Sequence, residues 1–553
     1  RPIEGDVDMA EAFNRVFSSV FRHGPDIAEI PWRPFDESIH TGLSTVEFTK
    51  ELVEQKLRNL KAFSAPGPDD MYPSILKNCA NELSGPLSII FTSSMMEGCL
   101  PAQWKRTNIT PIYKSGPKNR DENYRPINVC SAPCKIMESI IKDSLMEHLL
   151  SNNLVLPSQH GFMPGRSCVS NLLMYLDEVT SALDAGIPYD VIMVDFKRAF
   201  DVVPFHILLR KLEAHGIVGQ LLRWFCDWTT GRQQRVVING RSSGWESVIS
   251  SVVQGSVIGP VLFLLFINDI DCVIDEEGTR MFKYADDSKF GRRIGGDNDA
   301  AKLQLDLNGV DRWAKQNGME LHPQKTVVVH FGHNNPHYQY TLSETEVMSS
   351  GCVKDLGVHI NDKCTPEDHV TAVAKKANGI LGQIRRTTVN RSVDMVTRLY
   401  KTYVRPIVES SVQAWDPWLR RDIDIIEKVQ RRATKLASGI GSKEYEERLK
   451  ICNLTTLERR RERGSLIECF KLLNGYTNID TTNMFSFANE RHSLSTRSAT
   501  GALLVPKKSR LDVRKYFFSS RVVNIWNELP FEIRNAPSIN SFKNNYDLYT
   551  SEL

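Results

Sequence analysis

Two adjacent carboxylates stand out in the segment Tyr284-Ala285-Asp286-Asp287. Apolar or aromatic residues on both sides of it favour two strands, with the acids at a tight turn between them. Crowded carboxylates repel one another and need a cation. Hard oxygen ligands at this density suit Mg²⁺, and Mn²⁺ is a possible substitute. On its own, however, an Asp–Asp pair is more often a solvated turn.

A second acid makes the metal-site hypothesis stronger. The apolar run Val191–Val194 predicts a buried strand that ends at Asp195. Polymerases need one carboxylate from each of two neighbouring strands, so that two metal ions can bridge the carboxylates and a triphosphate. An apolar strand that ends in Asp, followed later by an aromatic-Ala-Asp-Asp turn, meets that need.

These two segments resemble motifs A and C of reverse transcriptases. The surrounding residues are most similar to those of non-LTR (LINE-type) retrotransposons, in particular the jockey-like branch. The resemblance implies an α+β fold of the right-hand polymerase type, with fingers, a palm built on an antiparallel sheet, and a thumb, followed by a mainly helical C-terminal region. It also implies an RNA-directed DNA polymerase that uses two Mg²⁺ ions. Asp195, Asp286 and Asp287 would be catalytic and metal-binding, and Phe196 would be a further metal ligand.

Other segments match the family in order and suggest a nucleotide site. Two predicted strands present Lys114 and Arg125 on one side, as a cationic clamp for a triphosphate requires. Phe200 resembles the steric gate that excludes a ribose 2′-hydroxyl. The string that contains Gln254 and Gly255 resembles motif B, and Lys325 in motif D is a candidate general acid for the pyrophosphate. The nucleotide-binding residues are therefore expected to be Lys114, Arg125, Phe200, Gln254, Gly255 and Lys325.

Two segments resemble the parts of the family that hold template and primer. Gln159–Cys168 has glycines around an aromatic residue and an arginine, which allows close approach of a template strand. Val353–Ile360 resembles motif E, the hairpin that grips the primer end. His160 has no nucleophile as a partner and is expected to be structural. The predicted template and primer contacts are Gly161, Phe162, Gly165, Arg166, Leu356 and Gly357.

Composition sets the broad class of the chain. Its 553 residues are 41% hydrophobic and 24% charged, as in ordinary soluble proteins of several subdomains. No apolar run is long enough to cross a bilayer, so no membrane partner is expected. Eleven cysteines without a leader indicate a reducing compartment, and the pair Cys130 and Cys134 lacks a second pair for zinc. A nuclear or cytoplasmic ribonucleoprotein is expected, rather than a secreted protein.

The chain is expected to divide into an N-terminal linker (1–60), fingers and palm (61–361, with a core of about 95–361), a helical thumb (362–440) and a C-terminal region of unknown role (441–553). Helices are predicted over Thr45–Leu60, Trp313–Glu320 and Ala372–Tyr403. The net charge of +3 says nothing about nucleic acid. Basic blocks after residue 370, including Arg459–Arg463, are either a phosphate footprint or solvated helix faces.

The expected partners are an RNA template, a DNA primer or target, and dNTPs. The chain begins at Arg1 rather than Met, and the endonuclease that precedes the polymerase in this family is expected to be missing from it. With that endonuclease, the family carries out target-primed reverse transcription. Two alternatives remain: a decayed copy that only binds nucleic acid, and an RNA-directed RNA polymerase, against which Phe200 speaks.

Overall fold

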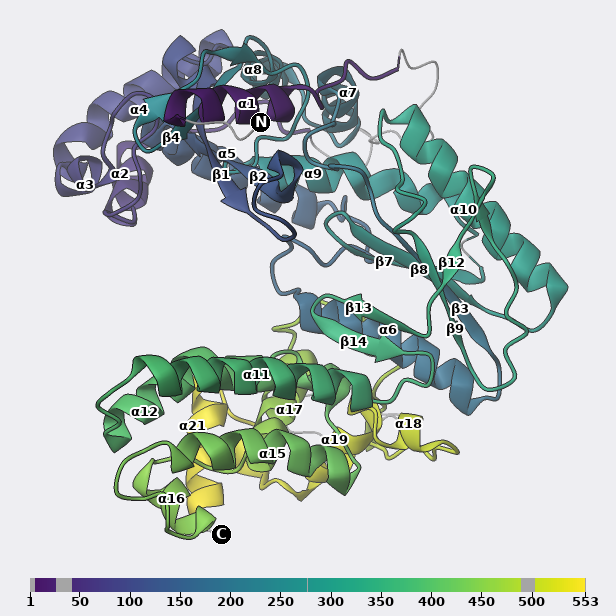
Figure 1. Ribbon diagram of the computed structural model, residues 1–553. Helices are drawn as coiled ribbons and strands as arrows, with labels where there is room; N and C mark the ends of the chain where they lie inside the picture. The colour runs from purple at the N-terminus through teal and green to yellow at the C-terminus, as the bar shows by residue number, and fades with distance from the viewer. Residues whose placement is uncertain (1–4, 26–41, 276, 489–502, 553) are drawn as a thin grey trace.

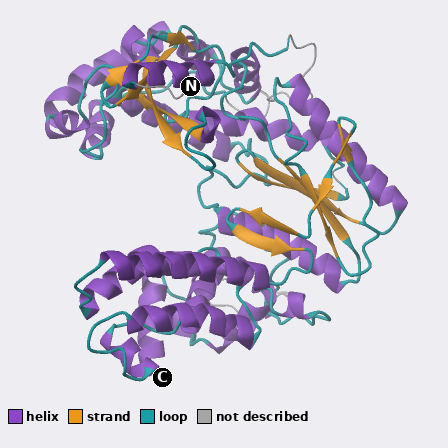
Figure 2. Cartoon of the chain, in the orientation of Figure 1, coloured by secondary structure: helices purple, strands orange, loops and turns teal. Residues whose placement is uncertain are grey.

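The computed structural model describes residues 5–25, 42–275, 277–488 and 503–552. It shows a mixed upper part, a central sheet at the right and a lower bundle of helices (Figure 1). Strands occupy the upper and central parts, and helices dominate the C-terminal part (Figure 2). The expected α+β class with a helical C-terminal region is therefore confirmed. None of the helices in the described ranges has the length and apolar character that a bilayer span requires.

The central sheet, called the palm sheet below, has five strands. The strand β3 lies in its middle, antiparallel to β8 on one side and to β9 on the other. Ile192 and Val194 belong to one apolar core, whereas Tyr189 and Val191 belong to another. Burial on both faces explains why this strand is apolar throughout. In spatial order the strands are β12 (Met348–Ser349), β9 (Val327–Phe331), β3 (Tyr189–Val194), β8 (Asp287–Arg293) and β7 (Thr279–Tyr284).

The predicted Asp–Asp turn joins β7 to β8. Tyr284 pairs with Asp287, which leaves Ala285 and Asp286 as the two turn residues. Ala285 has a φ of 57°, as the first position of a tight hairpin turn requires. Val194, the last residue of β3, pairs with Ser288. The register therefore brings the end of β3 beside the turn.

A second sheet, called the fingers sheet, lies in the upper part. Its strands are β1 (Arg106–Tyr113), β2 (Tyr124–Cys130), β4 (Gln233–Ile238), β5 (Arg241–Ser242) and β6 (Glu246–Ser247). The strands β1 and β2 form the predicted hairpin, and β4 runs parallel to β1. The helix α1 (Asp6–Ser18) covers one face of this sheet through Ala10 and Phe17.

Helices surround both sheets, and two of them differ from the sequence prediction. The predicted helix Thr45–Leu60 begins only at Lys50, because the Thr49 side chain accepts a bond from Leu52 N (3.2 Å) and caps it. The predicted helix Trp313–Glu320 is the end of a longer helix that stops at Gln316, just before Gly318 at a φ of +70°. The bounds are α2 (Lys50–Arg58), α3 (Pro73–Asn78), α4 (Ala80–Glu97), α5 (Ala132–Ser151), α6 (Cys168–Asp184), α7 (Phe205–Ala214), α8 (Gly219–Thr229), α9 (Gly259–Ile267) and α10 (Asp297–Gln316).

The C-terminal part is a bundle of helices that packs around a large apolar core, with a smaller cluster around Val396 and Ile440. The predicted helix Ala372–Tyr403 is interrupted, because Ser392 caps a new helix after residues 388–391. Ile426, Leu466 and Trp526 share one core with palm residues such as Tyr189. The expected divisions at residues 361 and 440 stay predictions. The bounds are α11 (Glu367–Thr387), α12 (Val393–Leu399), α13 (Arg405–Glu409), α14 (Val412–Trp415), α15 (Arg420–Lys435), α16 (Tyr445–Ile451), α17 (Leu457–Leu473), α18 (Asp512–Lys515), α19 (Phe518–Glu528), α20 (Phe531–Arg534) and α21 (Ile539–Glu552).

The arginine block of α17 is held largely in ion pairs within the protein. Arg460 pairs with Glu409, Arg461 with Asp416 at 2.7 Å, and Arg463 with Asp547 at 2.6 Å. Arg461 is also buried. These three residues fasten the bundle together, so the phosphate-footprint reading of this block does not hold for them.

A buried ion pair joins the palm sheet to the hairpin of β13 (Cys352–Asp355) and β14 (Val358–Asn361). The Lys289 ammonium group on β8 contacts the carboxylate of Asp355 and donates to Asn171 Oδ1 on α6 at 2.7 Å. It also lies over the Tyr175 ring, 4.6 Å from the centroid. This one side chain therefore connects β8 to the β13–β14 hairpin and to α6.

Removing only one partner of this ion pair should destabilise the folded protein. The Lys289→Met substitution leaves the buried Asp355 carboxylate without a counter-charge, and we expect it to lower the free energy of unfolding by about 3–5 kcal/mol. The double variant Lys289→Met/Asp355→Leu should regain most of that loss, because neither charge is then buried alone. Urea denaturation of the two variants measures the difference. A double variant no more stable than the single one would contradict this reading.

Candidate active site

The three predicted catalytic carboxylates lie together at the edge of the palm sheet. Asp195 directly follows β3, Asp286 forms the neighbouring turn, and Asp287 begins β8. Burial raises the pKa of Asp286, and the Asp195 charge raises it further. Burial likewise raises the pKa of Asp287 to about 6, with the Asp286 charge as the second cause. The acids are thus close enough to repel one another, and a cation would relieve that repulsion.

The segment before β9 holds Asp195 in place through backbone contacts. His322 N donates to the Asp195 carbonyl oxygen at 2.8 Å, and Lys197 N donates to the Glu320 carbonyl oxygen at 2.9 Å. This pairing brings Lys325 alongside, with its Nζ 3.1 Å from Asp195 Oδ2. The predicted general acid therefore lies against the carboxylate of Asp195, where its ammonium group occupies part of the space that suits a cation.

The donor set fits hard divalent cations. Within the described ranges, no group of three or more His, Cys, Asp or Glu side chains is arranged to hold a metal ion by itself. Mg²⁺ is commonly bound through one or two carboxylates, with substrate phosphates and water completing its shell, and Asp195 and Asp286 supply such a pair. Phe196 buries its ring against Trp313, with the centroids 6.3 Å apart, so it could offer a cation only its backbone carbonyl.

The two residues of the predicted cationic clamp lie on one side of the hairpin of β1 and β2. Ile112 pairs with Arg125 across the β1–β2 hairpin, and Lys114 follows two residues later on the same side. Burial lowers the pKa of Lys114, and the charges of Arg125 and Lys325 lower it further, whereas Asp195 and Asp286 act in the opposite direction. The fingers cations and the palm carboxylates therefore face a common space.

Phe200, the predicted gate residue, and motif B pack near the space between the fingers cations and the palm carboxylates. The Phe200 ring is stacked on Phe263, with centroids 4.2 Å apart and planes at 21°, and it remains partly exposed. Gln254 Nε2 donates to Asp201 Oδ1 at 3.0 Å, and the Gln254 carbonyl oxygen accepts from Asn128 N at 2.8 Å. Motif B therefore connects the residue after the gate to the fingers strand β2.

Gly255 allows that connection. Its φ is +125°, and a Cβ at this position would lie 2.2 Å from the Asn128 carbonyl oxygen. The predicted close backbone approach thus occurs, but it is an approach to β2 of the fingers sheet.

The glycine-rich loop from Gln159 supports the catalytic turn. Gln159 Oε1 accepts from Gly161 N at 2.9 Å and from Ala285 N at 3.0 Å. A Cβ on Gly161 would lie 2.5 Å from Ala285 N, so only glycine fits there. His160 N donates to the Lys283 carbonyl oxygen at 2.8 Å. This loop was predicted to approach template, and the structure places Gly161 against the protein's own turn.

The rest of that loop has two different environments. Arg166 Nε donates to the Asn478 carbonyl oxygen at 2.8 Å, and the Gly165 carbonyl oxygen accepts from Asn478 N at 3.1 Å. These two residues therefore contact the C-terminal part. Phe162, at a φ of 57°, is 49% exposed and remains available for a ligand.

The predicted primer-gripping residues form a turn. Leu356 and Gly357 join β13 to β14 with φ values of 45° and 91°, which is the left-handed conformation that a two-residue hairpin turn requires. Asp355, just before the turn, is the partner of Lys289. The turn is therefore anchored to the catalytic strand.

Comparison with known proteins identifies a domain. Residues 116–360 match the family model described as reverse transcriptase (RNA-dependent DNA polymerase), and this range includes Asp195, Asp286 and Asp287. The chain therefore carries a reverse transcriptase domain. It is 26% identical to the probable RNA-directed DNA polymerase from transposon BS of Drosophila melanogaster over 70% of this chain and 44% of that protein.

Two further relatives point the same way. The chain is 24% identical to the probable RNA-directed DNA polymerase from transposon X-element of Drosophila melanogaster, over 68% of this chain and 42% of that protein. It is 23% identical to the RNA-directed DNA polymerase from mobile element jockey of the same species, over 73% of this chain and 45% of that protein. The resemblance to LINE-type enzymes agrees with these names. The chain spans less than half the length of each relative.

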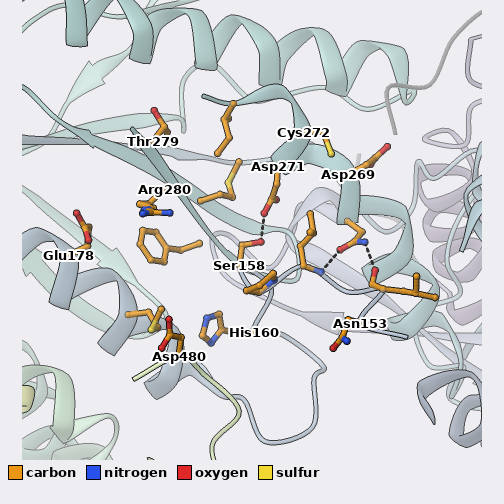
Figure 3. A pocket seen from close by; sticks show the side chains of 18 of the residues that line it. Asn153, Ser158, His160, Glu178, Asp269, Asp271, Cys272, Thr279, Arg280 and Asp480 are labelled. Atoms are coloured by element: carbon orange, nitrogen blue, oxygen red, sulfur yellow. Dashed lines mark hydrogen bonds between the residues drawn. The ribbon is translucent and has the colours of Figure 1, made fainter. Parts of the chain in front are cut away.

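A cavity of about 860 Å³ lies elsewhere in the molecule, beside β7 and the short helix η3 (Asn268–Val273). Figure 3 shows Ser158, His160, Arg280 and Asp480 around it. Asp195, Asp286 and Asp287 do not line it. His160 is buried there with Nδ1 2.8 Å from Ser170 Oγ, and burial lowers its pKa to about 3. The neutral imidazole agrees with the structural role predicted for this residue.

Three supporting residues of the reverse transcriptase domain had no predicted role of this kind. Gln159 was noted only as the start of a motif, and Asp201 and Lys289 were given no role. Their partners lie 126, 53 and 66 residues away in the sequence. The only signal in the sequence is their closeness to motif residues, which does not identify a partner.

Adding one methyl group behind the catalytic turn should disturb the domain. Gly161→Ala places a carbon where Ala285 N already lies, so we expect a lower midpoint of thermal unfolding. Gly379→Ala is the matched control, because this glycine of α11 has open space around its Cβ position. Alanine should leave that helix as stable or slightly more stable. Equal midpoints for the two variants would show that the turn moves freely away from Gly161.

The buried Asp201 carboxyl should make stability depend on pH. Burial raises its pKa to about 6, against opposing effects of Arg198, Gln254 and Arg125. Because this value lies above that of the unfolded chain, the stabilisation from Asp201 is complete below about pH 4 and is lost as the pH rises through about 6. Asp201→Asn keeps an acceptor for Gln254 and removes this loss.

We therefore expect the unfolding free energy of Asp201→Asn to rise relative to wild type between about pH 4 and 7, by up to about 3 kcal/mol. Urea denaturation at several pH values measures it, and the exposed Asp121→Asn is the control. A difference that is constant across this range would show that Asp201 is ionised throughout.

Proposed function

We propose that this chain is an RNA-directed DNA polymerase that copies retrotransposon RNA into DNA, in target-primed reverse transcription. The observation that carries the proposal is the pair of acids at the ends of neighbouring strands, Asp195 and Asp286, opposite the cations Lys114 and Arg125. Nucleotidyl transfer needs this combination, with metal-binding acids on one side of a triphosphate and fixed cations on the other. The matched family model and the names of the relatives support the same activity.

Asp195, Asp286 and Asp287, with the Phe196 carbonyl, would hold two Mg²⁺ ions. When bound, such ions lower the pKa of the primer 3′-hydroxyl and neutralise the triphosphate. The protein's own work is positioning, because phosphoryl transfer leaves little covalent chemistry to its side chains. The turn that carries Asp286 is suited to that work, since Gln159 and β8 hold it from two sides.

The remaining predicted residues have consistent roles. Lys114 and Arg125 bind the triphosphate, and Phe200, fixed on Phe263, fills the space beside the sugar at the 2′ position. Lys325 moves from Asp195 to the leaving pyrophosphate and donates a proton to it. Gln254 and Gly255 hold motif B against the fingers strand β2. Phe162, Leu356 and Gly357 contact template and primer.

The complete target-primed reaction also requires a nick in the target DNA. Because this chain spans less than half of each relative, the nick in the target DNA is assigned to a further endonuclease domain of the same reading frame. The natural form is then a nuclear or cytoplasmic ribonucleoprotein. Two rivals are a decayed copy that only binds nucleic acid and an RNA-directed RNA polymerase.

Primer extension separates these possibilities. The purified chain receives an RNA template, a DNA primer, Mg²⁺, and either dNTPs or NTPs. We expect extension with dNTPs, little or none with NTPs because of Phe200, and a loss of at least about 1,000-fold in Asp286→Ala, which cannot hold the metal pair. Asp8→Ala, on the exposed side of α1, is the control and should behave as wild type.

Each other outcome selects a rival. Equal use of NTPs would remove the gate role from Phe200 and favour an RNA polymerase. Duplex binding without extension in the wild type would favour the decayed copy. Full activity in Asp286→Ala would overturn the assignment of the catalytic site.

A further inference from the structure

A short extended segment runs beside the palm strand β7. Lys283 N donates to the Ser158 carbonyl oxygen, and the Lys283 carbonyl oxygen accepts from His160 N, both at 2.8 Å. Gln159, which lies between these two residues, forms a parallel bridge with Lys283. Residues 157–160, called the edge segment below, therefore extend the edge of the palm sheet by one short strand.

The edge segment holds the turn that carries Asp286. Gln159 Oε1 accepts from Ala285 N at 3.0 Å, and Ala285 directly precedes Asp286. Gln159 is only 1% exposed, so this hydrogen bond is shielded from water. A displacement of the edge segment along β7 would therefore move the Asp286 carboxylate relative to Asp195.

Arg166 takes the place of a further strand on the free side of the edge segment. In an extended chain successive carbonyl groups point to opposite sides, so Pro157 and Gln159 turn their carbonyl groups away from β7. Arg166 Nη1 donates to both oxygens, at 2.9 Å to Pro157 and at 2.5 Å to Gln159. One guanidinium nitrogen thus holds two carbonyl groups of the edge segment.

The same guanidinium group is fastened to the C-terminal part. Arg166 Nε donates to the Asn478 carbonyl oxygen at 2.8 Å, and Asn478 N donates to the Gly165 carbonyl oxygen at 3.1 Å. A Cβ on Gly165 would lie 3.2 Å from the Tyr476 carbonyl oxygen, so the two chain segments pack closely. Tyr476 N in turn donates to the Lys471 carbonyl oxygen on α17 at 2.9 Å. The helical bundle therefore fixes the chain that holds Arg166.

We propose that Arg166 is a positioning residue through which the C-terminal part holds the Asp286 turn in its reactive place. The proposal rests on the polymerase function proposed above, and it assigns a role to the region after residue 440. The path runs from Asn478 through the guanidinium group and the edge segment to the Gln159 amide and the turn. Each link is a hydrogen bond of 2.5 to 3.0 Å.

Two substitutions of Arg166 separate this role from a contact with a template phosphate. A guanidinium group presents its donors in a rigid fork, whereas the lysine ammonium group is a single point charge. Arg166→Lys keeps the charge but cannot hold Asn478 and both carbonyl groups of the edge segment in the same geometry. A phosphate contact needs mainly the charge, which Arg166→Lys retains and Arg166→Met removes.

Arg510 offers a matched control at the other end of α6. It also joins the C-terminal part to backbone carbonyl groups, because its Nε donates to Asp184 and its Nη2 to Leu183, both at 2.9 Å. The 17 residues of α6 separate this contact from Arg166, about 26 Å at 1.5 Å per residue. Arg510→Lys makes the same chemical change without a contact to the edge segment.

Hydrogen–deuterium exchange measures the turn without catalysis. Gln159 protects the Ala285 amide, so we expect this amide to exchange about fivefold faster or more in Arg166→Lys and Arg166→Met. Gly165→Ala keeps the Arg166 side chain but crowds the C-terminal chain at a φ of +71°, and it should act in the same direction. Arg510→Lys should exchange as wild type, and unchanged exchange in α10 shows that each variant is folded.

Primer extension gives a second readout. We expect both Arg166 variants to lose about 10- to 100-fold in kcat, because a misplaced carboxylate slows the chemical step. The KM for dNTPs should stay within about twofold of wild type, since Lys114 and Arg125 are untouched. The Kd for primer–template and its salt dependence should also remain those of wild type, because no phosphate contact is lost.

Three results would overturn the positioning role. The first is wild-type exchange of the Ala285 amide in Arg166→Lys. The second is equal acceleration in Arg510→Lys, which would indicate a general loosening of the bundle. The third is wild-type kcat in Arg166→Lys with weaker template binding in Arg166→Met, which would assign Arg166 to the template. A wild type that extends no primer would contradict the proposed function, and the exchange measurement would still decide whether Arg166 holds the turn.

Discussion

Electrostatic repulsion among Asp195, Asp286 and Asp287 is the constraint around which the palm is built. Burial and mutual repulsion both raise the pKa of the turn carboxylates, so the fold holds these acids in a state that they do not prefer. Such an arrangement persists only where the surrounding structure fixes it. The cations Lys325, Lys114 and Arg125 oppose the repulsion. The pKa values of Asp286 and Asp287 stay raised in spite of them, mainly because both side chains are buried, so a bound divalent cation would stabilise the ionised carboxylates.

The backbone supplies the necessary rigidity. Asp195 is held through its own carbonyl oxygen by His322 N, and the turn is held by β8 on one side and by the Gln159 amide oxygen on the other. Both supports are main-chain or short side-chain contacts, which tolerate little displacement. A reaction that depends on aligning two substrates benefits from such supports, because an error of about 1 Å in position costs on the order of 100-fold in rate.

The sequence predicted those parts of the structure that depend on local pattern. The apolar run before Asp195 and the aromatic residues around the acids were sufficient to place two neighbouring strands, because buried strands must be apolar and tight turns have few sequences. Helix ends were less predictable. The helix predicted from Thr45 starts at Lys50, since residue 43 pairs with residue 217 and Thr49 acts as a cap. Contacts such as Lys289 with Asp355 join residues 66 positions apart and leave no local mark.

For the same reason, the sequence alone does not show which charged residues form ion pairs. A net charge of +3 and scattered basic blocks cannot show which arginines are free, because the answer depends on partners that only the fold brings close. Three arginines of α17 in a dense basic block are held by Glu409, Asp416 and Asp547. Arg106 and Arg235 lie outside any such block, and they remain without a carboxylate partner in the described residues. Clustering of arginines along the sequence therefore does not show which of them lack a carboxylate partner in the fold.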